Sequence, residues 1–96
     1  MAKNTHPGFR LRRIILDKGI QFQRVAEAMA VTKPTLSLIT TGKQKITPPI
    51  ALAIVKALGE EYGTAWDWAV AQIAYDMQEL RNAAAAKSGE PMEVAA

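Results

Sequence analysis

Residues 21–42, QFQRVAEAMAVTKPTLSLITTG, restrict the possible fold more than any other stretch, because they have the pattern of two short helices joined by a turn. Apolar residues recur at helical spacing through residues 21–29, which predicts the first helix. These residues are Phe22, Val25, Ala26 and Met29. Ala30 and Val31 are left for the turn. This order is that of a helix-turn-helix, but any small helical bundle can also contain it.

The second helix of this stretch has a start signal, an inward face and a stop signal. Thr32 can accept a hydrogen bond from the free N–H groups that open a helix, and Pro34 is tolerated in the first turn. Leu36 and Ile39 have the spacing of an inward face, and Gly42 stands where a left-handed residue commonly ends a helix. The outward side chains are short or polar, as in a helix that enters the major groove of DNA. They are Lys33, Thr35, Ser37 and Thr40.

Charge is divided unevenly along the chain. Residues 1–56 hold ten lysines and arginines against two acidic residues, a net charge of +8, whereas residues 57–96 hold two against seven, a net charge of −5. A basic half that contains the helix-turn-helix pattern is what a phosphate backbone attracts. The coincidence favours DNA binding over ordinary solvated surface charge.

Composition argues against several other classes. The chain has 96 residues, which suits one domain, and 49% of them are apolar, enough for a core. With no cysteine and one histidine, it offers neither disulfides nor a ligand set for a metal, and we expect no metal and no cofactor. No apolar run is long enough for a membrane span, and the N-terminus lacks the apolar segment of a secretory signal, so we expect a cytoplasmic protein. An enzyme is the least favoured class, because no catalytic constellation is recognisable.

Start and stop signals predict further helices, and weak strand signals make the expected fold all-α. One helix covers residues 9–18 and ends at Gly19. His6 belongs to a turn-like entry before that helix and is expected to cap or pack rather than bind a ligand. Another helix follows Thr47, its expected cap, and ends at Gly59.

The last predicted helix is long and carries two lines of side chains. Thr64 caps it, and it reaches about Ala86, where a domain of residues 1–86 ends and an expected disordered tail of residues 87–96 begins. One apolar line steps by four and three residues, as in a heptad seam, and is the candidate dimer interface. It consists of Trp66, Val70, Ile73, Met77 and Leu80. A second line runs beside it and consists of Trp68, Gln72 and Tyr75. The pattern fits either a helix that packs on its own domain and on a partner, or one wide core face.

Taken together, these pieces resemble HigA-type antitoxins, which belong to the larger group of phage-repressor-like (XRE) helix-turn-helix proteins. The resemblance covers roughly residues 6–81 and lies in the order and spacing of its parts. Those parts are His6-Pro7-Gly8, Pro34-Thr35-Leu36-Ser37, Gly42-Lys43, Ile46-Thr47-Pro48, Ala57-Leu58-Gly59, and Trp68 with Gln72 and Ala74-Tyr75-Asp76.

The resemblance implies a fold of five helices, a homodimer and binding to an inverted-repeat operator in double-stranded DNA. It also implies a partner toxin, usually a small mRNA-cleaving ribonuclease, and repression of the protein's own operon. The sequence departs from the family at three residues and in the loop between Leu58 and Trp68, which is longer than usual. Phe22 replaces a glutamine that usually meets a phosphate, Leu38 replaces a polar reader, and Thr41 replaces an asparagine before the closing glycine.

The candidate DNA contacts divide into base readers and phosphate contacts. Lys33, Pro34, Ser37 and Leu38 are expected to face base edges, where lysine can donate to guanine and leucine offers only apolar contact. Residues that flank the recognition helix are expected to meet phosphates. The full set is Gln21, Gln23, Thr32, Lys33, Pro34, Thr35, Ser37, Leu38, Lys43, Gln44 and Lys45.

Three functions remain open at this point. The first is a dimeric repressor that is also an antitoxin, and the second is a stand-alone phage-type repressor without a toxin. The third is a protein-interaction module that has lost DNA binding, which Phe22 and Leu38 motivate. The dimer contacts could also come from the helix at residues 9–18 or from the helix that follows Thr47.

Overall fold

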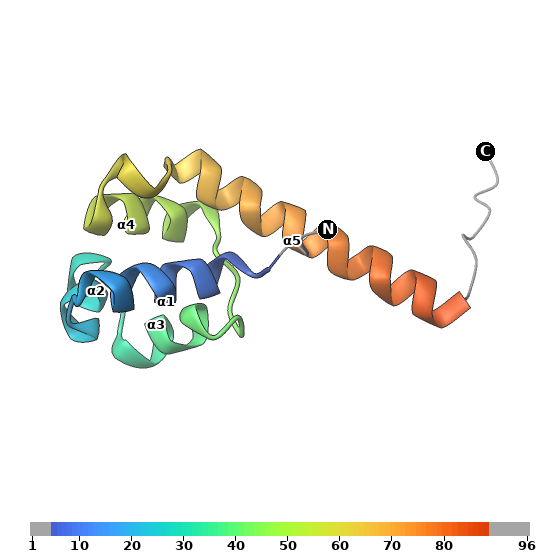
Figure 1. Ribbon diagram of the computed structural model, residues 1–96, viewed down its shortest axis with the longest axis horizontal. Coiled ribbons are helices and arrows are strands. Elements are labelled where there is room, and N and C mark those ends of the chain that lie inside the picture. The colour runs from blue at the N-terminus through green and yellow to red at the C-terminus, as the bar shows by residue number, and fades with distance from the viewer. Residues whose placement is uncertain (1–4, 89–96) are drawn as a thin grey trace.

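The computed structural model describes residues 5–88, which form five α-helices and one 3-10 helix, with no strand in that range (Figure 1). The elements are α1 (Pro7–Lys18), α2 (Phe22–Ala28), α3 (Lys33–Thr40), α4 (Pro48–Leu58), η1 (Glu60–Tyr62) and α5 (Ala65–Ser88). The all-α fold with five helices and a long last helix is confirmed. The expected tail lies outside the described residues apart from residues 87–88, which are still part of α5.

Several helix ends differ by one or two residues from the sequence prediction. Helix α1 begins at Pro7 rather than Phe9, because His6 already acts as its cap and proline needs no N–H partner at the first position. Helix α2 is one residue shorter at each end than residues 21–29, since Gln21 has an extended backbone. The expected loop before α5 contains the short helix η1.

The expected threonine caps of α4 and α5 behave differently. Thr64 Oγ1 accepts a hydrogen bond from the Asp67 N–H at 3.1 Å, and the Thr64 N–H donates to Asp67 Oδ2 at 3.0 Å, which is a reciprocal capping arrangement. Thr47 occupies the cap position of α4, but its side chain makes no capping hydrogen bond. The prediction of a side-chain cap there is wrong: Pro49 has no N–H to donate at the second position, and the Ile50 N–H at the third makes no hydrogen bond to the Thr47 side chain.

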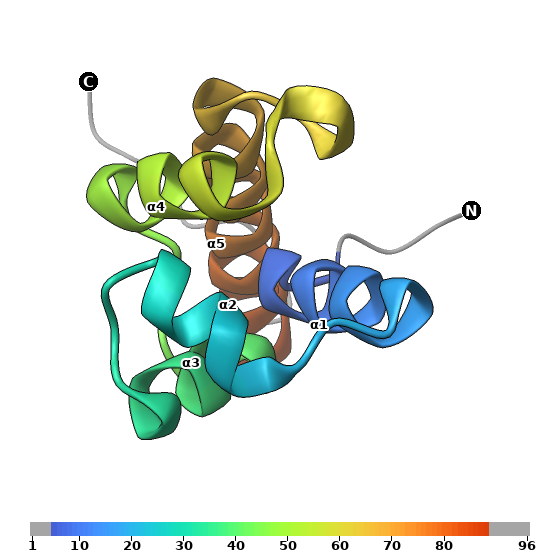
Figure 2. The same cartoon turned by 90° about the vertical axis from the view of Figure 1, so that its left-hand side faces the viewer.

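The core lies between the helices and takes side chains from all five of them. In Figure 2, α4 lies on one side, α1, α2 and α3 lie on the other, and α5 runs behind them. Helix α5 packs on α4 and on α1, while α3 packs on α1 and α2. Trp68 of α5 is 1% exposed and is the largest fully buried side chain. The same buried cluster contains Leu11, Ile14, Ile15, Val25, Ala26, Met29, Leu36, Ile39, Ile46, Ala51 and Ile54.

The two lines of α5 face in different directions. Trp68 and Gln72 are buried, and Tyr75 is half-buried. The heptad line is exposed: Trp66 is 77% exposed, Val70 42%, Ile73 60%, Met77 55% and Leu80 66%. The alternative prediction, that the two lines form one wide core face, is therefore wrong. Helix α5 has an apolar strip that its own domain leaves uncovered. We call these five residues the α5 strip.

The start of α1 lies against the end of α3 at a distance that only glycine permits. Gly8 is buried, and a Cβ atom built on it would overlap the carbonyl oxygen of Ile39. His6 is 2% exposed beside this contact, and its ring meets the rings of Phe9 and Tyr75 edge-on at 6.2 Å and 5.0 Å. His6 Nδ1 accepts a hydrogen bond from the Gly8 N–H at 2.9 Å, which confirms its capping role.

Acidification is expected to destabilise the fold through His6. Burial lowers the pKa of His6 below its usual 6.5, against a smaller opposite effect of Asp76, and a protonated Nδ1 could not accept the Gly8 N–H. The unfolded chain therefore binds the proton first, so this stabilisation is complete above pH 6.5 and is lost as the pH falls through the lowered pKa. Urea titrations between pH 8 and 5 measure the effect. The variant His6→Asn, which can still cap, should flatten this dependence, and an unchanged slope in the variant would refute the assignment.

Among the described helices, none combines the length and the hydropathy that crossing a bilayer requires.

Candidate nucleic-acid interface

Helices α2 and α3 are joined by a turn that bends at an alanine. Ala30 has a φ of 58°, which makes it the only residue other than glycine with a positive φ in the described part of the chain. A left-handed backbone costs a side chain about 1–2 kcal/mol, so the surrounding packing must hold the turn. The Val31 N–H donates to the Ala26 carbonyl at 2.9 Å, and Met29 is buried beneath the turn.

Helix α3 is held at both ends by its own side chains and loop. Thr32 Oγ1 accepts from the Thr35 N–H at 3.2 Å, which confirms the predicted cap. At the other end, Gly42 has a φ of 78°, and the N–H groups of Lys43 and Gln44 both donate to the Leu38 carbonyl, at 2.9 and 3.1 Å. The start of the loop after α3 is thus folded back onto the helix.

The outward face of α3 is largely the predicted one. Leu36 and Ile39 are fully buried, and the exposed side chains are Lys33, Pro34, Ser37 and Leu38, of which Leu38 is 43% exposed. Thr40 was expected to face outward, but it is buried and its hydroxyl donates to the Leu36 carbonyl at 2.9 Å. That expectation is wrong because a threonine can satisfy its hydroxyl within its own helix.

Thr32 and Thr35, both candidate DNA contacts, are hydrogen-bonded to each other. Thr35 is half-buried, and its hydroxyl accepts a hydrogen bond from the Thr32 hydroxyl at 2.9 Å. A nucleic acid would therefore find Lys33, Ser37 and Leu38 more accessible than this pair.

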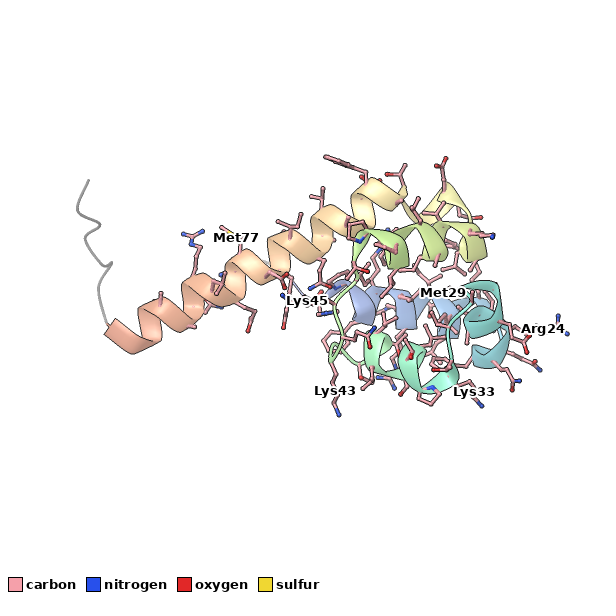
Figure 3. The ribbon with its side chains drawn as sticks, turned by 180° about the vertical axis from the view of Figure 1, so that it is seen from behind. Arg24, Met29, Lys33, Lys43, Lys45 and Met77 are labelled. Atoms are coloured by element: carbon pink, nitrogen blue, oxygen red, sulfur yellow. The ribbon has the colours of Figure 1, made fainter. Side chains whose placement is uncertain are left out.

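Cations surround the face on the side away from α5. Figure 3 shows Arg24, Lys33 and Lys43 projecting outward from α2, from the start of α3 and from the loop after α3. None of the three forms an ion pair within the described residues. Arg24 was missing from the predicted contacts, although its place in the first helix of the motif was a usable signal.

Two of the three predicted glutamines, Gln21 and Gln23, are exposed at the start of α2 or on it. Gln21 is the cap residue of α2 and makes no side-chain capping bond. Gln23 Nε2 lies 3.4 Å from Glu27 Oε2 on the same helix, a long hydrogen bond that a phosphate could replace.

Lys45 differs from Lys43, although both were predicted to meet phosphates. Its ammonium lies 3.4 Å from Asp76 Oδ2, and Figure 3 shows it near α5 rather than at the outer edge of α3. Gln44, between the two lysines, is half-buried. The structure thus separates the three loop residues that the sequence had grouped.

Other cations of the basic half also bind the acidic half of the same chain. The Arg10 guanidinium donates to the Tyr62 carbonyl at 2.7 Å and lies 5.1 Å from the centre of the Trp68 ring. Lys18 lies 4.0 Å from Glu61, and hydrogen bonding to Tyr62, followed by the charge of Glu61, raises the pKa of Lys18. Part of the +8 charge therefore holds the domain together, and the share available to a phosphate backbone is smaller than the sequence suggested.

The surroundings of Phe22 explain why an apolar residue can replace the glutamine that is usual in the family it resembles. It is half-buried against the core and borders a hollow of about 200 Å³ between α1, α2 and α3. This hollow is also lined by Arg12, Leu16 and Ser37. The position thus packs instead of presenting a polar group.

No group of three or more histidine, cysteine, aspartate or glutamate side chains able to hold a metal ion occurs within residues 5–88.

Known structures share this arrangement. No protein-family model and no curated protein matches the sequence. An antidote protein of a plasmid maintenance system from Nostoc punctiforme is 24% identical, with a TM-score of 0.83 over 98% of this chain and all of that chain. The Pseudomonas aeruginosa antitoxin HigA, solved with the higBA promoter, is 21% identical, with a TM-score of 0.78 over 97% of this chain and all of that one.

A third structure is a Pseudomonas aeruginosa protein in complex with 28 base pairs of its operator DNA. It is 21% identical, with a TM-score of 0.79 over 97% of this chain and all of that chain. At these identities the likeness establishes the fold, and the chain has the helix-turn-helix fold of HigA-type antitoxins, as the resemblance implied.

Proposed function

We propose that this protein is a dimeric DNA-binding repressor of its own operon and the antitoxin of a toxin–antitoxin pair. The observation that carries the proposal is one folded domain with two exposed surfaces of different chemistry. The outer face of α3 is small and mixed in polarity and is bordered by the cations Arg24, Lys33 and Lys43, whereas the α5 strip is apolar. The first suits a DNA groove, and the second suits a protein.

DNA binding is supported by the presentation of α3. A capped helix with a buried inner face and an exposed outer face can enter the major groove, and cations on both sides of it can reach the phosphates. Lys33 in the first turn is the candidate reader of guanine, while Leu38 offers an apolar surface to a thymine methyl group. Two of the similar structures were solved with operator or promoter DNA, and the third is an antidote protein of a plasmid maintenance system, which agrees with this assignment.

Dimerisation is supported by the α5 strip. Inverted-repeat operators require two recognition helices, and a heptad line of exposed apolar side chains can hold two copies together. The toxin partner rests on the resemblance and on the similar antidote structures. Co-purification of the protein with the product of the neighbouring gene tests it, and failure to retain that product would favour the stand-alone repressor.

Substitutions of lysine are expected to separate base reading from phosphate binding. Lys33→Ala should relax the choice at one base pair, at a cost of about 1–3 kcal/mol on the operator alone. Lys43→Ala should weaken binding to all sequences equally and reduce the slope of log K against log salt by about one. Lys45→Ala should have the smaller effect of the two loop lysines, because this ammonium already has a partner in Asp76.

Salt titrations with DNA from upstream of the gene, and with a scrambled duplex, measure these effects. Equal losses for Lys33→Ala and Lys43→Ala on both duplexes would show that α3 does not read bases. Absence of binding by the unmodified protein to either duplex would favour the interaction module.

A further inference from the structure

A chain of polar contacts joins the loop after α3 to α5. The Ile46 N–H donates to Gln72 Oε1 at 2.8 Å, and Gln72 Nε2 donates to Asp76 Oδ1 at 2.9 Å. The other oxygen of Asp76 lies 3.4 Å from the Lys45 ammonium. Ile46 and Gln72 are 2% and 3% exposed, so these buried hydrogen bonds hold Asp76 in place.

The two ends of the loop are therefore held by different elements. Lys43 and Gln44 are bonded through their N–H groups to the Leu38 carbonyl of α3, whereas Lys45 and Ile46 are bonded to α5. The two lysines lie close in sequence, yet one projects into solvent and the other is held by a carboxylate.

We propose that Asp76 competes with DNA phosphate for Lys45 and so limits the affinity of the protein for nucleic acid. This inference rests on the proposed DNA binding. The carboxylate takes the place that a phosphate oxygen would occupy on the ammonium, because both are anionic oxygen acceptors. Binding of a phosphate by Lys45 requires that the contact with Asp76 be broken or shared.

The exposure of the pair sets the size of the effect. The side chain of Lys45 is 70% exposed and that of Asp76 is 30% exposed, so solvent screens their attraction and the lysine can exchange partners. Removal of the carboxylate charge should therefore strengthen DNA binding by about two- to fivefold. The gain should occur on operator and scrambled duplexes alike, because phosphates carry no sequence information.

Asp76→Asn is the matched variant. The amide oxygen of asparagine can still accept from Gln72 Nε2, so the hydrogen bonds of Gln72 are retained while the negative charge is lost. Glu79→Gln serves as the control, since it removes one negative charge from an exposed side chain of the same helix that forms no ion pair within the described residues.

The experiment is a double-mutant cycle of Asp76→Asn and Lys45→Ala with two polyanions, a duplex titrated with salt and immobilised heparin eluted with salt. Asp76→Asn is expected to bind the duplex about two- to fivefold more tightly, to steepen the salt dependence by up to about one, and to elute from heparin at higher salt. None of these gains should appear in the Lys45→Ala background, and Glu79→Gln should show none.

Two results would overturn the proposal. The same gain in both backgrounds would mean a general effect of net charge, and no gain in either would mean that the pair does not restrain Lys45. The heparin arm separates this proposal from the proposed function. Later elution that depends on Lys45, without duplex binding by any variant, would support the competition and reject DNA binding.

Discussion

Replacement of Ile73 by aspartate is expected to convert the proposed dimer to a monomer and to abolish the proposed binding to an inverted-repeat operator. Ile73 is in the centre of the α5 strip and is 60% exposed in the single chain. In a dimer, the new carboxylate would be buried without a partner, which costs about 3–5 kcal/mol and weakens association by at least about 100-fold. Light scattering over a range of concentrations measures the mass.

Matched variants on other helices test whether the interface is elsewhere. Leu16→Asp on α1 and Leu52→Asp on α4 introduce the same charge at side chains that are 67% and 64% exposed. Both proteins should remain dimers. A monomer from either of them, together with a dimer of Ile73→Asp, would move the interface to that helix, and circular dichroism would check that each variant is folded.

Replacement of Gly8 by alanine is expected to destabilise the protein by about 1–3 kcal/mol or more, as for overpacking of a core. The added methyl group would meet the backbone of Ile39, which cannot rotate away as a side chain can, so α1 and α3 must separate. This loss opposes the gain in helix propensity that alanine brings. Urea unfolding measures the difference.

Gly19→Ala provides the control, because that glycine has a φ of 64° and no atom within 4 Å of an added Cβ. It isolates the cost of a left-handed backbone, about 1–2 kcal/mol. A Gly8→Ala protein as stable as the unmodified one would mean that α1 and α3 do not approach as described. Since α3 carries the candidate DNA contacts, Gly8→Ala should also weaken DNA binding.

Local signals in the sequence predicted most of the fold. Thr32 and Gly42 delimit α3 through hydrogen bonds and dihedral angles within a few residues, and such interactions are encoded locally. Apolar spacing likewise assigned Leu36 and Ile39 to the core. The signal at Thr47 predicted the start of α4, but the side-chain hydrogen bond that it implied is not made.

Contacts between distant residues could not be predicted in the same way. Lys45 looked equivalent to Lys43 because nothing near them in sequence shows that Asp76, 31 positions later, lies beside one of them. The contact of Gly8 with Ile39 and the hydrogen bond from Arg10 to Tyr62 are of the same kind. Charge counts along the chain assigned all these cations to DNA, since pairing within the fold depends on tertiary packing.

The exposed end of α5 has a consequence for the lifetime of the protein. Every residue from Glu79 to Ala85 is exposed, so the last turns of the helix bury little apolar surface (Figure 1). Such a segment unwinds at a small fraction of the free energy of global unfolding, and proteases cleave transiently unwound segments. A partner that covers the helix raises the free energy of unwinding by mass action. The concentration of that partner would then set how fast the chain is degraded.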